Sequence, residues 1–174
     1  DKAKTGDFIV SGVLASVSIP LYYLGLVAFA QQISLQNKGL GIAYFIVLTI
    51  GAMGGVGFHL NACFMPLIYK VIMKNGGSLQ MVEEIYATMR KACSVSAVLT
   101  YGILVLVNSI WVWVVILMGI VEVPKILCLL TPLAFFIVGK LLSKCSKIFH
   151  TFPLAVTNTL GMGGIAVIAL VSMM

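Results

Sequence analysis

Charged side chains are scarce in this sequence. Only 9% of the 174 residues are Asp, Glu, Lys or Arg, whereas 61% are hydrophobic and the mean hydropathy is +1.13. Soluble domains carry about 25% charged residues, and this chain has too few to cover a water-facing surface. The composition excludes a soluble globular protein and predicts helices that are solvated by lipid.

Acidic residues are few, with five in the whole chain. None lies within the body of a long apolar stretch, and Glu122 falls at the edge of one. Proton-coupled pumps and cation channels normally use carboxylates inside the membrane, so this absence argues against both classes. It also removes most candidates for general acid and base catalysis.

Metal-binding motifs are lacking as well. The two histidines, His59 and His150, have no carboxylate within eight residues, and the four cysteines form no C-x-x-C pair. We therefore expect no metal site, no cofactor and no disulfide. The basic residues are scattered over several loops and do not form one contiguous face, so we expect no binding of nucleic acid.

Five apolar stretches are long enough to cross a membrane, since about 20 helical residues span the hydrocarbon core. We expect the first to be a retained helix and not a cleaved signal peptide. The sequence thus predicts an all-α integral membrane protein, a bundle of five transmembrane helices that forms a single domain over 1–174. The expected spans are about 8–30, 40–69, 92–120, 126–142 and 148–174.

Lysine and arginine are unevenly divided between the two sides of this arrangement. Nine of the 11 fall on the side of the amino terminus, and Lys38 and Lys125 fall on the other. Basic residues are concentrated on the cytoplasmic side of membrane proteins. We therefore expect a cytoplasmic amino terminus, cytoplasmic loops after the second and fourth spans, and a carboxyl terminus outside.

The loop after the second span has the character of a soluble amphipathic helix. Gly76 and Gly77 interrupt the chain, and Ser78 is a suitable N-cap for a cytoplasmic helix over 78–91. Apolar residues recur in it at helical spacing, with acidic residues near its start and basic residues near its end. This helix either lies on the inner membrane surface or extends the third span into the cytoplasm.

A glycine-rich run, G-A-M-G-G-V-G-F-H over 51–59, leads to His59 in the second span. Gly51 and Gly55 form a G-x-x-x-G pair, which lets another helix approach closely. Gly55 also lies one turn before His59 and leaves room beside the imidazole. Small residues on the fifth span predict close packing there too, at Gly161 and Gly164.

Polar side chains of three spans gather near the cytoplasmic side, where we predict a pocket that opens toward the inner leaflet. His59 is its main predicted polar contact. Asn61 lies about 200° around the helix from His59, so both can face one pocket only if Pro66 distorts the turn. The alternative for each side chain is a hydrogen bond to a neighbouring helix. The predicted ligand-binding residues are His59, Tyr101, His150, Asn158 and Asn61.

The run Gly54-Gly55-Val56-Gly57-Phe58-His59, followed by Pro66, a long loop and the Pro124-Lys125 turn, resembles an uncharacterised family of small bacterial multi-pass membrane proteins. The similarity is one of layout over most of the chain together with the short Gly-His motif. The resemblance implies a location in the bacterial cytoplasmic membrane and brings no established substrate.

Three hypotheses of function follow. The leading one is a protein that binds a hydrophobic or amphiphilic small molecule, lipid included, in the predicted pocket. The second is an intramembrane enzyme that modifies a lipid with His59 as acid or base. The third is a structural or partner-binding subunit that associates through its glycine-rich faces. The expected partners are membrane lipid, a hydrophobic small molecule and a second copy of the chain.

Overall fold

The computed structural model is all-α and describes residues 4–145 and 152–174, with the side chains of 4–144 and 160–174. Seven α-helices, one π-helix and one 3-10 helix fill the described part of the chain. Three of the helical stretches there are long and apolar enough to cross a membrane, at Thr5–Gln36, Lys38–Lys74 and Ser94–Leu117. These stretches mark the chain as an integral membrane protein, because helices of this length and composition bury their apolar surface in lipid.

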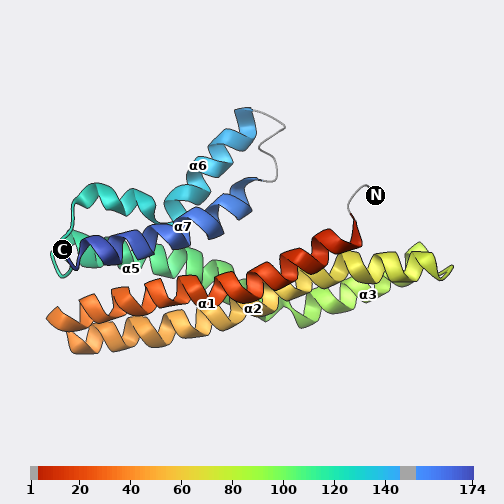
Figure 1. The fold of residues 1–174 in the computed structure, drawn as a ribbon, viewed down its shortest axis with the longest axis horizontal. Coiled ribbons are helices and arrows are strands. Elements are labelled where there is room, and N and C mark those ends of the chain that lie inside the picture. The colour runs from red at the N-terminus through yellow and green to blue at the C-terminus, as the bar shows by residue number, and fades with distance from the viewer. Residues whose placement is uncertain (1–3, 146–151) are drawn as a thin grey trace.

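The two longest helices form an antiparallel hairpin (Figure 1). The helix α1 covers Thr5–Gln36 and α2 covers Lys38–Lys74, so Asn37 alone reverses the chain. Its backbone N–H donates to the carbonyl of Ile33 at 2.8 Å, and its side-chain oxygen accepts from the N–H of Leu40 at 3.0 Å. Asn37 thus satisfies backbone groups of both helices, which allows so tight a connection.

The segment after α2 folds back along it as a long, nearly continuous helical run. Gly76, with a φ of +75°, turns the chain, and Ser78 caps α3 (Leu79–Ala92) by accepting from the N–H of Met81 at 3.2 Å. A turn at Cys93 leads into α4 (Ser94–Val98), the π-helix η1 (Leu99–Val107) and α5 (Asn108–Leu117). Figure 1 shows α3 extending this line beside the end of α2.

A partly buried hydroxyl group attaches α3 to α2. The hydroxyl of Tyr86 donates to the carbonyl oxygen of Met65 at 2.5 Å. Burial and, after it, the neighbouring Tyr69 raise the pKa of Tyr86 above its usual value, which keeps this hydroxyl protonated as a donor. Val82 is buried on the same helix, so α3 packs against the rest of the chain and contacts α2.

The predicted fourth span, 126–142, differs from the continuous helix that its length suggested. It consists of the 3-10 helix η2 (Lys125–Leu130), a break at Thr131, and α6 (Pro132–Cys145). Pro132 carries no N–H, so the carbonyl of Cys128 cannot accept from it. That carbonyl instead accepts from the indole of Trp113 at 2.9 Å and the hydroxyl of Thr131 at 2.9 Å.

The last helix, α7 (Phe152–Val171), lies against this break. A Cβ atom on Gly164 would overlap the carbonyl oxygen of Leu130, and one on Gly161 would lie 2.8 Å from the nitrogen of Pro132. Glycine at both positions permits the close approach. The buried core joins α1, α2, η1, α5 and α7, and its largest fully buried side chains include Tyr44, Phe29, Leu26, Ile33, Leu48, Leu104, Ile165 and Ile168.

This contact predicts different outcomes for two neighbouring glycines. Gly164→Ala should lower the melting temperature of the detergent-solubilised protein by several degrees, because overpacking of this kind typically costs about 1–3 kcal/mol. Gly163→Ala is the matched control, since a Cβ there meets nothing within 4 Å. Equal melting temperatures for the two variants in a thermal unfolding assay would contradict the packing of α7 on the break.

Candidate ligand pocket

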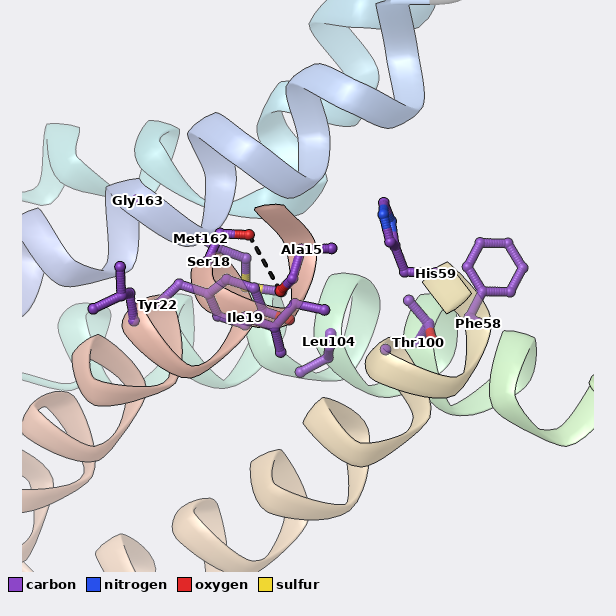
Figure 2. A pocket seen from close by; sticks show the side chains of 12 residues that line it. Ala15, Ser18, Ile19, Tyr22, Phe58, His59, Thr100, Leu104, Met162 and Gly163 are labelled. Carbon is purple, nitrogen blue, oxygen red and sulfur yellow. Dashed lines mark hydrogen bonds between the residues drawn. The ribbon is translucent and has the colours of Figure 1, made fainter. Parts of the chain in front are cut away.

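A cavity of about 480 Å³ lies among α1, α2, η1 and α7 (Figure 2). It is found near the middle of α1, α2 and α7 along the chain. Most of its wall is apolar, and its polar side chains are those of Ser18, Tyr22, His59 and Thr100. The residues that complete the lining are Ala15, Ile19, Leu21, Gly55, Phe58, Leu104, Met162 and Gly163.

His59 is the polar group of α2 in this wall. Its side chain is partly buried, and its Nε2 atom lies 3.5 Å from the sulfur of Cys63 one turn further along the helix. Figure 2 shows the imidazole extending from α2 across the open space from Met162 and Ser18. The ring therefore lies between the cavity and the Cys63 thiol.

The hydroxyl groups of the wall retain acceptor capacity. Thr100 donates its hydroxyl proton to the carbonyl of Ser96 at 2.7 Å, and Ser18 donates to the carbonyl of Ala15 at 3.5 Å. A hydroxyl oxygen that donates to its own helix still has lone pairs for another donor. The site can thus combine apolar contact with a few hydrogen bonds to one polar group of a ligand.

The cavity exists because small residues face it. A Cβ on Gly163 would meet nothing within 4 Å, whereas one on Gly55 would lie 3.5 Å from the hydroxyl of Tyr22 and 3.2 Å from Leu104 Cδ1. Gly55 therefore leaves room for Tyr22 beside His59. Thr100 and Leu104 reach the same wall from the π-helix η1, and π-helical turns are frequent at functional sites.

The other predicted packing glycines contact two different partners. A Cβ on Gly51 would lie 2.8 Å from Cγ2 of Ile103, so this glycine brings α2 close to η1. Gly161 and Gly164 instead face the break between η2 and α6. The small-residue faces of α2 and α7 are thus each used for packing within the chain.

The predicted ligand-binding residues do not all lie in the cavity wall. His59 lines the cavity, and Tyr101 packs edge-on against Phe58, with ring centroids 5.2 Å apart, behind the lining. Asn61 is not in the cavity wall, and its buried Oδ1 atom has no hydrogen-bond partner in the described part of the chain. His150 and the side chain of Asn158 lie outside the described residues.

Sequence reasoning missed the wall that α1 contributes. Ala15, Ser18 and Tyr22 recur at the spacing of one helix face, and this spacing could have identified them as a set. Met162 and Gly163 were also missed, because nothing in the sequence of α7 indicates that it packs beside α1. Within the described residues, no group of three or more His, Cys, Asp or Glu side chains could hold a metal ion.

Comparison with known proteins gives a family and no activity. No curated protein matches the chain, and no solved structure matches it either. A family model does match, and it covers residues 1–174, the whole of the sequence. The chain therefore belongs to the DUF6796 family, a family of unknown function.

Proposed function

We propose that the protein binds a hydrophobic or amphiphilic small molecule, lipid included, in the cavity beside His59. The observation that carries this proposal is the cavity itself, which has a volume of about 480 Å³ and a largely apolar wall with a few convergent polar groups. Ligand sites typically measure about 300–1,000 Å³ and have this composition. In a membrane protein, the surrounding lipid can supply amphiphiles to a cavity of that size.

The lining restricts the chemistry of the ligand. Among the described residues in the wall, none is Asp, Glu, Lys or Arg. A charged ligand group would lack an ionic partner there, and burying it unpaired is unfavourable. We therefore propose a ligand with an apolar body and an uncharged hydrogen-bonding group, such as a hydroxyl, carbonyl or ester, near His59.

We further propose five membrane crossings, a cytoplasmic amino terminus and an outer carboxyl terminus, in the bacterial cytoplasmic membrane. The helices η2 and α6 together would provide the fourth crossing, because six 3-10 residues and 14 α-helical residues have a combined length, summed over the two helices, of roughly 33 Å. The 20 residues of α7 extend for about 30 Å. In this arrangement the cavity opens toward the inner leaflet, and nine of the 11 basic residues are cytoplasmic.

A second candidate function is an intramembrane enzyme in which His59 acts as acid or base. The contact between Nε2 of His59 and the Cys63 sulfur favours it, since a histidine beside a thiol is a common arrangement in nucleophilic catalysis. The third hypothesis, association through glycine-rich faces, has less support because those faces pack within the chain.

The ligand proposal predicts a small molecule that co-purifies with the protein and is lost when the cavity is filled. Gly163→Leu should remove it, because the new side chain enters open space in the cavity wall. His59→Gln should weaken its retention by up to about tenfold, the value of one hydrogen bond. Mass spectrometry of gently solubilised protein measures both effects.

The matched control is Gly102→Leu, since Gly102 also has nothing within 4 Å but does not line the cavity. We expect it to retain the ligand at the wild-type level. If all four proteins carry the same bulk lipid, the proposal is wrong.

The topology proposal predicts opposite labelling of two loops in intact bacterial cells. Glu122→Cys should react with a membrane-impermeant maleimide added outside, whereas Ser78→Cys should react only after the cells are permeabilised. The labelling of each variant is compared with that of the wild type, which has four native cysteines. Extracellular labelling of residue 78 would reverse the proposed orientation.

A further inference from the structure

A second hollow lies between α1 and the last third of α2, outside the ligand cavity. It is a groove of about 330 Å³ with an almost entirely apolar wall. On its α1 side, Gly12 has no side chain and Ser16 has a small one, which leaves the groove open there. Val13 and Val17 are exposed beside them. The residues that complete the groove are Phe8, Ile9, Leu60, Cys63, Phe64 and Leu67.

Cys63 contributes a thiol to the wall of this groove. It is 94% buried, yet its sulfur has two acceptors within reach, Nε2 of His59 at 3.5 Å and Oγ of Ser11 at 3.8 Å. With its proton on Nδ1, the imidazole presents a lone pair on Nε2 to the thiol. An imidazole in this position can accept the proton of the thiol, as histidine does for cysteine in nucleophilic catalysis.

A basic side chain lies beside one end of the groove. The ammonium of Lys70 lies 5.7 Å from the ring centroid of Phe8, which belongs to the groove wall. Lys70 follows Cys63 by seven residues, about 10 Å along the helix. A molecule with a polar carrier group and a hydrocarbon chain matches this order, with its polar end on the side of Lys70, its reactive carbon near Cys63 and its chain toward Val17.

We propose that Cys63 is an acyl-acceptor site: a fatty acyl thioester transfers its acyl group to the Cys63 sulfur, with His59 as the base and the groove holding the acyl chain. This modification site goes beyond the proposed ligand binding and does not depend on it. The groove is separate from the cavity, and His59 lies between the two.

The step conserves atoms and electrons without a change of oxidation state. The Cys63 sulfur attacks the thioester carbonyl carbon while Nε2 of His59 takes the thiol proton. The tetrahedral intermediate then breaks the bond between that carbon and the donor sulfur, and His59 returns the proton to the departing thiolate. The products are S-acylated Cys63, a neutral His59 and the free thiol of the carrier.

The test uses the full chain in lipid nanodiscs with alkynyl palmitoyl coenzyme A as the donor. Adducts are mapped by mass spectrometry on every cysteine and tested for cleavage by hydroxylamine, which removes thioesters. We expect a hydroxylamine-sensitive adduct on Cys63 of the wild-type protein. No adduct at Cys63, or equally fast labelling of Cys93 or Cys128, overturns the proposal.

Variants test the base and the groove separately. His59→Gln should slow labelling of Cys63 by about 100-fold, as expected for loss of a general base. Gly12→Leu should slow it by about tenfold or more, because its side chain fills the groove. Gly6→Leu is the matched control on the same helix, since neither glycine has an atom within 4 Å of its added Cβ and Gly6 is not part of the groove.

The outcome is distinguishable from that of the ligand proposal. Gly163→Leu blocks the cavity and should leave acylation of Cys63 at the wild-type rate, whereas Gly12→Leu should leave the co-purifying ligand in place. Wild-type labelling rates in both His59→Gln and Gly12→Leu would overturn the acyl-acceptor role while leaving ligand binding intact.

Discussion

The structure depends on one constraint, which is that a backbone surrounded by apolar groups must satisfy its own hydrogen bonds. Continuous helices meet this requirement along most of the chain. The break at Thr131 is the exception, and side chains of a neighbouring helix compensate for it. Trp113 donates to the Cys128 carbonyl, and the hydroxyl of Ser109 accepts from the N–H of Leu133 at 2.9 Å. These bonds satisfy the Cys128 carbonyl and the Leu133 N–H at the point where the segment before α6 leaves helical geometry.

The buried hydrogen bonds also determine which helices share the core. The Tyr44 hydroxyl donates to the side-chain oxygen of Asn108 at 2.8 Å, and the amide nitrogen of Asn108 lies 4.0 Å from the Met162 sulfur. Asn108 thus joins α2, α5 and α7 at one fully buried point. Polar contacts of this kind hold helices together where lipid is as apolar as the core. Met162, which contacts Asn108, also lines the cavity.

His59 connects the two hollows of the molecule. Its ring lines the cavity, and its Nε2 atom faces the thiol that lines the groove. A single imidazole can therefore serve as a hydrogen-bonding contact for a bound amphiphile and as a base for Cys63. The two roles use different neighbours, and substitutions at Gly163 and Gly12 separate them because each glycine belongs to one hollow.

The sequence by itself determined the all-α class, the three long apolar stretches and the Ser78 cap, because length, composition and capping residues are local properties. Tertiary structure alone decided the cavity walls supplied by α1 and α7 and the side chains that satisfy the backbone at the break before Pro132. The physical reason is that lipid-facing and core-facing positions of a membrane helix are equally apolar. Hydrophobic periodicity, which identifies the buried face of a soluble helix, therefore cannot say which neighbour each helix packs against or where a space remains.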